Sequence, residues 1–165
     1  MNPERKHNIE INWTYPRQFD DVDKVNWEEE SEKDYYNHYY VYYISRIFNG
    51  IETPIYIGIT EQEFKDRLKQ HFKDKKDFFK KRGVKTYRIG RIKKAWWISQ
   101  LNDKEKRDLL ETLEAHVINE LFDDYNLTND KKIKSATFYY KLSVTHKGKY
   151  GKLNKSPYSV EYGKY

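Results

Sequence analysis

A small set of side chains in this sequence has the types and the order that phosphodiester chemistry uses. Two tyrosines, Tyr43 and Tyr56, lie in two apolar stretches. Arg67 and His71 follow four residues apart, and a carboxylate, Glu114, comes later. A hydroxyl, a guanidinium, an imidazole and a carboxylate are groups that can cut a phosphodiester together with one divalent metal. This ordered set indicates function more directly than composition does.

Glu114 has an unusual place in a predicted helix. The pattern predicts that this helix begins at Asn102 and runs to about Phe122. At about 100° per residue, Glu114 falls inside the apolar arc of the helix. That arc consists of Leu110, Leu113, Val117 and Leu121. A carboxylate there must reach solvent, pair with a cation or bind a metal. A salt bridge to an arginine of a neighbouring helix is the alternative to a metal site, and Glu111, nearer the edge of the arc, is expected at the surface.

Arg67 and His71 lie on a second predicted helix. The stretch Thr60 to Glu63 matches a capping box, and apolar residues follow it at intervals of four, so a helix is expected to begin there. Arg67 and His71 are one turn apart at the edge of the apolar stripe and point the same way. Together they can converge on an anion, because a guanidinium fits phosphate oxygens. Either residue alone would more often be a solvated surface side chain.

Strands are predicted around the two tyrosines. Tyr39 to Ile47 and Ile55 to Ile59 are rich in aromatic and β-branched residues, and Asn49-Gly50 between them is a turn signal. These segments predict an antiparallel hairpin. Ala95 to Leu101 and Thr137 to Val144 are further strand candidates. On residue type alone, Tyr43 and Tyr56 would more often be aromatics at the edge of a core than catalysts.

Composition limits the class of protein. The chain has 165 residues, of which 37% are hydrophobic and 35% charged, so one small core with a solvated surface is expected. The net charge of +6 and the many aromatics suit a polyanionic partner, although a basic protein without such a partner is the alternative. The absence of cysteine excludes disulfides and cysteine-bound zinc. No apolar run approaches the roughly 20 residues of a membrane span, so we expect a soluble, cytoplasmic protein without a membrane partner.

Charge is distributed unevenly along the chain. Asp20 to Asp34 is acidic, whereas Lys65 to Lys94 and the region from Lys131 onward are basic. Double-stranded DNA is expected to bind the basic stretch, where cations alternate with aromatics, and a solvated charged face is the alternative. The candidate DNA-binding residues are Lys80, Lys81, Arg82, Arg88, Arg91, Lys93 and Lys94.

Between Tyr39 and Asn126 the chain resembles the GIY-YIG nucleases. The two triplets that name the family match Val41-Tyr42-Tyr43 and Tyr56-Ile57-Gly58, the second without change. The family's Arg-x-x-x-His pair matches Arg67 and His71, and its helical glutamate and terminal asparagine match Glu114 and Asn126. The first triplet departs from the family pattern, because valine and tyrosine replace its glycine and isoleucine.

The resemblance implies a fold and a division of roles. The fold would be α+β, with a small antiparallel sheet of about three strands flanked by helices. Residues 1–38 would form an N-terminal extension, 39–126 the nuclease core, and 127–165 a basic C-terminal extension packed on the core. Glu114 would hold one Mg²⁺ or another divalent cation such as Mn²⁺, and Arg67 would bind the scissile phosphate. Tyr43 would take a proton from the attacking water with help from Tyr56 or His71, and Asn126 would fix its segment near the site.

The resemblance also implies hydrolysis of DNA, but the biological role stays open. A compact chain is most similar to type II restriction enzymes of the family, and an enzyme that cuts a palindromic site would act as a homodimer. A homing, phage or mobile-element nuclease is an alternative. A non-catalytic DNA-binding module of the same fold and a basic scaffold protein are alternatives from other functional classes.

Overall fold

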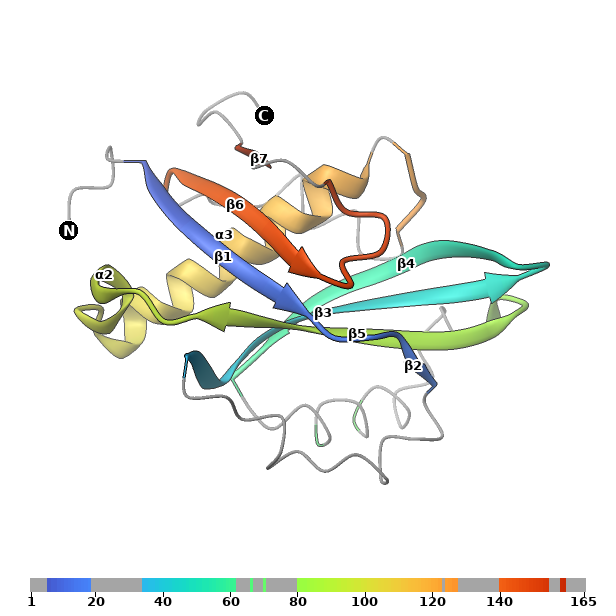
Figure 1. Cartoon of the computed structure of the whole chain (residues 1–165), viewed down its shortest axis with the longest axis horizontal. Helices are drawn as coiled ribbons and strands as arrows, with labels where there is room; N and C mark the ends of the chain where they lie inside the picture. Colours follow the sequence, from blue (N-terminus) through green and yellow to red (C-terminus); the bar gives the residue numbers. More distant parts are fainter. Residues whose placement is uncertain are drawn as a thin grey trace.

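The structure is a computed structural model, and it describes residues 6–18, 34–61, 66, 70, 80–122, 124–127, 140–154 and 158–159. Strands and two helices follow one another along these residues, as Figure 1 shows. The strands are β1 His7–Trp13, β2 Arg17–Gln18, β3 Tyr35–Phe48, β4 Ile51–Thr60, β5 Val84–Lys93, β6 Leu142–Gly148 and β7 Tyr158–Ser159. The helices are α2 Trp96–Ser99 and α3 Asp103–Phe122.

All strands join one mixed sheet. Within the described residues it contains seven strands, in the order β4-β3-β5-β1-β6-β7, with β2 beside β5. β3 pairs antiparallel with β4 and β5, and β1 pairs antiparallel with β5 but parallel with β6. The α+β class is therefore confirmed. The expected sheet of about three antiparallel strands is too small, because strands from both ends of the chain extend it.

The central hairpin is confirmed, but the third strand lies elsewhere than predicted. β3 and β4 are joined through Asn49 and Gly50, both at positive φ. The expected strand from Ala95 to Leu101 is wrong, since the helix α2 forms there. The strand beside β3 is β5, Val84–Lys93. Its lysines and arginines had marked this segment only as a basic stretch. The expected strand from Thr137 to Val144 overlaps β6 at Leu142 to Val144, and its residues before Tyr140 lie outside the described part of the chain.

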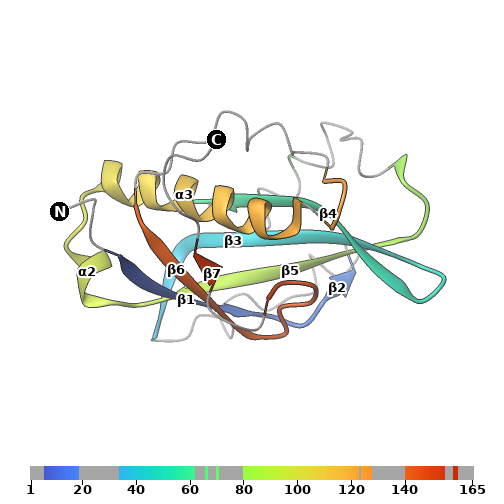
Figure 2. The ribbon, with the colours of Figure 1, turned by 90° about the horizontal axis from the view of Figure 1, so that it is seen from above.

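The long helix α3 forms where the sequence predicts it. Asn102 Oδ1 accepts a hydrogen bond from the Glu105 amide at 2.9 Å, and Glu105 Oε2 accepts one from the Asn102 amide at 2.9 Å. These reciprocal bonds fix the start of the helix, because they satisfy amides that have no partner within it. Figure 2 shows α3 running along β4 and β3, with which it is in contact. No helix among the described residues is long and apolar enough to cross a membrane.

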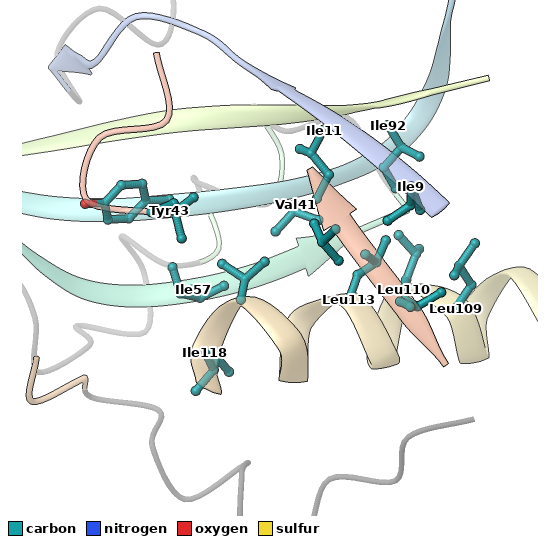
Figure 3. Close-up of a cluster of buried hydrophobic side chains, with 14 of the residues drawn as sticks. Ile9, Ile11, Val41, Tyr43, Ile57, Ile92, Leu109, Leu110, Leu113 and Ile118 are labelled. Atoms are coloured by element: carbon teal, nitrogen blue, oxygen red, sulfur yellow. The ribbon is translucent and has the colours of Figure 1, made fainter. Parts of the chain in front are cut away.

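The sheet has two distinct faces. On one, here called the α3 face, Val41, Tyr43 and Ile57 belong to the main core, which also contains the leucines of α3, as Figure 3 shows. On the other, here called the tyrosine face, Tyr42 and Tyr56 pack with Ile44, Ile55, Tyr87 and Ile89. Successive residues of a strand point to opposite faces, so the register of the hairpin decides which side chains can meet.

Candidate functional site

The register of the hairpin separates the two tyrosines that the sequence had placed in one site. Tyr43 pairs with Ile57, and Ile44 pairs with Tyr56. Paired residues share a face, so Tyr43 and Tyr56 lie on opposite faces of the sheet. Tyr43 is fully buried on the α3 face beside Trp13. The prediction that Tyr43 and Tyr56 share one pocket is therefore contradicted.

Tyr42 is the tyrosine that lies with Tyr56. Their ring centroids are 5.9 Å apart, and the ring planes differ by 24°, so the two rings are stacked. Tyr42 pairs with Gly58 across the hairpin. A Cβ at Gly58 would collide with the hydroxyl end of the Tyr42 ring. Gly58 of the second triplet thus leaves the space that the Tyr42 ring fills.

The surroundings of Tyr43 oppose ionisation of its hydroxyl. Burial is the main cause that raises the pKa of Tyr43 far above its usual value, and the nearby carboxylate of Glu52 raises it further. The Arg88 guanidinium, 5.8 Å from the ring centroid, and the Lys152 amide act in the opposite direction but are outweighed. Tyr43 stays protonated near neutral pH, which does not suit a general base.

The Arg88 side chain is buried, and its guanidinium is hydrogen-bonded within the protein. Its guanidinium donates to both carboxylate oxygens of Glu52, at 2.9 and 2.7 Å, and to the Lys149 carbonyl at 2.8 Å. Ser45 Oγ donates to the same carboxylate at 2.9 Å. Arg88 is only 6% exposed. A buried bidentate pair of this kind orients its partners, and it leaves the predicted contact of Arg88 with DNA without an accessible guanidinium.

Glu114 is buried on α3, as its place in the apolar arc predicted, and Glu111 is exposed. Glu120 of the same helix contacts His146 on β6. Six residues separate Glu114 from Glu120, so the two side chains leave the helix about 120° apart. Glu114 therefore leaves α3 in a different direction from Glu120, and α3 itself packs on the face of the sheet opposite to Tyr42 and Tyr56.

The donor chemistry of Glu114 fits a hard divalent cation. The described residues contain no group of three or more His, Cys, Asp or Glu side chains that could hold a metal together. Mg²⁺ does not need such a group, because it keeps several waters and commonly uses one or two carboxylates plus substrate phosphate. A single carboxylate would thus be a sufficient protein ligand, and Glu114 has the donor chemistry for that role.

The other predicted site residues are dispersed or lie outside the described residues. Arg67 and His71 fall outside them. Asn126 is exposed after α3, and its carbonyl lies 3.5 Å from Lys81 Nζ. Arg91 and Lys93 lie on the tyrosine face, since Arg91 pairs with Tyr40. The remaining predicted DNA-binding residues are Lys80, Lys81 and Arg82, which precede β5, and Lys94, which follows it.

A comparison with known families assigns the central part of this fold. Residues 38–126, more than half of the chain, match the family model described as the GIY-YIG catalytic domain. The chain belongs to the GIY-YIG family. No curated protein and no solved structure matches it. The matched range contains β3 from residue 38 onward and all of β4, β5, α2 and α3, whereas β1, β2, β6 and β7 lie outside it.

The first signature triplet of the family, Gly-Ile-Tyr, can be matched one residue earlier than Val41-Tyr42-Tyr43. Tyr40-Val41-Tyr42 puts β-branched Val41 at the isoleucine position and Tyr42 at the tyrosine position. This match agrees with the stacking of Tyr42 on Tyr56. Because Tyr42 and Tyr43 are adjacent, either of them can be matched to the tyrosine of the family triplet. The one available signal was that Val41 resembles isoleucine more than glycine.

Proposed function

We propose that this protein is a metal-dependent endonuclease that hydrolyses phosphodiester bonds of double-stranded DNA. The observation that supports the proposal best is the stacked pair of Tyr42 and Tyr56 on one face of the hairpin, each from one signature triplet. Membership in a nuclease family supplies the reaction class. The basic net charge of +6 suits a polyanionic substrate.

The proposed roles follow from chemistry and position. Tyr42 is as fully buried as Tyr43, but its ring stacks on Tyr56. On that ground Tyr42 takes the place that the sequence had assigned to Tyr43 and accepts a proton from the attacking water, with Tyr56 or His71 assisting. Arg67 binds an oxygen of the scissile phosphate. Glu114 holds Mg²⁺ or a similar cation, which when bound stabilises the charge that develops on phosphate and leaving oxygens. Asn126 keeps its proposed role of fixing the segment after α3.

DNA is proposed to lie along the cations that flank the tyrosine face, since the central side chains of that face are buried. The residues proposed for backbone contact are Lys80, Lys81, Arg82, Arg91, Lys93 and Lys94. Arg88 is left out because Glu52 and the Lys149 carbonyl occupy its guanidinium. The finer proposal is a restriction-type enzyme that acts on a palindromic site as a homodimer.

Incubation of the purified protein with supercoiled plasmid and Mg²⁺ tests this function. We expect discrete linear fragments, and no cleavage in EDTA. A smear would contradict the site-specific restriction role but not the nuclease. Intact plasmid under all metal conditions would contradict the nuclease and favour a DNA-binding module.

Substitution of the adjacent tyrosines tests the proposed base. Tyr42→Phe should lower the single-turnover cleavage rate by at least about 100-fold, the usual contribution of a general base, without a loss of DNA affinity. Tyr43→Phe is the matched control, since it removes the same atom one residue away on the α3 face, and it should cleave like the wild type. If Tyr43→Phe lost activity while Tyr42→Phe kept it, the role would return to Tyr43.

A further inference from the structure

The turn end of the β3–β4 hairpin carries two large apolar side chains that are exposed to solvent. Phe48 and Ile51 form the last cross-strand pair before the turn and are 43% and 65% exposed. Exposed large apolar residues are few in the described part of the chain. Val84, 49% exposed, lies at the same end of the sheet but on its other face. A patch of this kind on a charged protein marks a contact surface.

Two cations lie beside this pair on the same face. Arg46 pairs with Lys85 across β3 and β5. The register of β3 on β5 is regular from Tyr40 to Ile47, so Arg46 and Lys85 share the tyrosine face with Tyr42. Phe48 lies two residues beyond Arg46 on the same strand and therefore on the same face. We call Arg46, Phe48, Ile51 and Lys85 the hairpin tip.

The cations of the hairpin tip face each other without an acidic partner among the described residues. The ion pairs of the described residues include neither Arg46 nor Lys85. Their polar contacts are backbone carbonyls. Arg46 Nη1 lies 3.5 Å from the Arg82 carbonyl, and Lys85 Nζ donates to the Gly83 carbonyl at 2.8 Å and to the Lys81 carbonyl. Burial, and then the charge of Arg46, lower the pKa of Lys85. Like charges paired across a sheet destabilise it, and an anion between them would remove that cost.

We propose that the hairpin tip is a second contact with duplex DNA, in which Arg46 and Lys85 hold backbone phosphates and Phe48 and Ile51 enter a groove. This inference rests on the proposed function and adds a specificity surface to it. Apolar side chains flanked by cations are the combination that reads methyl groups and base steps in DNA grooves. A second copy of this chain is a poorer occupant, because two basic tips would repel each other.

The hairpin tip would contact the duplex away from the scissile bond. Six residues of extended strand separate Tyr42 from Phe48, a span of about 20 Å. One strand of DNA advances about 3.4 Å per base pair, so the span corresponds to about six base pairs. The hairpin tip should therefore affect affinity and sequence preference and leave the rate of the bound complex unchanged.

Fluorescence anisotropy with a labelled 30-base-pair duplex, in EDTA and over a range of KCl concentrations, tests the proposal. Arg46→Gln/Lys85→Gln should reduce the slope of log affinity against log salt by about 2, since each phosphate contact contributes about 0.9. Phe48→Ala/Ile51→Ala should raise Kd about tenfold with an unchanged slope. Both variants should cleave at the wild-type rate when enzyme is saturating.

Two control variants match these substitutions. Val84→Ala removes an exposed apolar side chain at the same end of the sheet, but on the α3 face, because Val84 pairs with Ile47. Lys104→Gln/Arg107→Gln removes two exposed cations from α3. Both controls should keep the wild-type Kd and salt slope.

Wild-type affinity and slope in both tip variants would overturn the inference while the nuclease assignment stood. A change of oligomeric mass in light scattering, with Kd unchanged, would also overturn it and would assign the tip to contact between copies. If Phe48→Ala/Ile51→Ala failed to fold, the salt slope of Arg46→Gln/Lys85→Gln would still decide. A wild-type protein that bound no duplex would contradict the proposed function itself.

Discussion

At the scale of single residues, a buried histidine on α3 links stability to pH. His116 is 1% exposed, and burial is the first cause that lowers its pKa to about 4, with the charge of nearby His146 as the second. In the unfolded chain the pKa would return to about 6.5. Between these two values the unfolded state binds a proton that the folded state does not, so stability must fall as the pH falls.

The expected effect of His116 is large enough to measure. A difference of about 2.5 pKa units corresponds to about 3 kcal/mol, present above pH 6.5 and lost progressively toward pH 4. His116→Gln should remove this part of the pH dependence. Urea unfolding of both proteins between pH 4 and 7.5 would measure it. Identical pH profiles would show that His116 is not kept neutral by the fold.

Both ring nitrogens of a neighbouring histidine, His146, are hydrogen-bonded. The Trp13 indole can only donate, and it donates to His146 Nδ1 at 2.9 Å. The proton of His146 is therefore on Nε2, which donates to Glu120 at 2.9 Å. Glu120 also accepts from the Asn154 amide. This chain of bonds connects β1, β6, α3 and the segment after β6, so it is a structural tie and not part of the proposed site.

At the scale of elements, the hairpin pairs Gly58 with Tyr42, and the missing side chain of Gly58 sets the position of the Tyr42 ring. In Gly58→Ala the added Cβ would collide with the end of the fully buried Tyr42 ring, so the ring must shift. To make room, the Tyr42 ring must leave its place beside Tyr56. We expect cleavage at saturating DNA to fall at least about tenfold, since small misplacements of a catalytic group are costly.

A control for the hairpin substitution is available at its turn. Gly50 lies at φ +74° with open space around its Cα, so Gly50→Asn changes the hairpin without reaching Tyr42. Asparagine tolerates this conformation. The control should cleave like the wild type. If Gly58→Ala also kept full activity, the position of the Tyr42 ring would not matter for the reaction.

The same elements explain what could be predicted from the sequence. The hairpin and α3 carry local signals, namely the Asn49-Gly50 turn and the Asn102–Glu105 capping box, and both formed as predicted. The choice between Tyr42 and Tyr43 had no local signal, because a shift of one residue exchanges the faces of a strand. β5 was missed since its cations on the tyrosine face interrupt the apolar alternation that identifies a strand.

At the scale of the whole molecule, the two ends of the chain complete the sheet. β1 lies between β5 and β6, and its parallel pairing with β6 joins residues more than 130 positions apart. Ile9, Ile11 and Trp13 of β1 and two apolar residues of β6 are buried in the main core. No turn or cap in the sequence signals such a distant pairing, which is why the terminal regions were expected only as extensions.

This architecture predicts that residues 38–126 do not fold alone. Loss of β1 and β6 would expose core side chains that each contribute about 1.5–3 kcal/mol by burial, on the order of 10 kcal/mol in total. That sum is comparable to the whole stability of a typical domain. We expect the fragment to show no cooperative thermal transition by circular dichroism and to leave plasmid uncut, whereas a chain that lacks only residues 1–5 should behave like the full protein. Cooperative unfolding of the 38–126 fragment, with cleavage retained, would mean that the nuclease core is autonomous and that β1 and β6 serve another purpose.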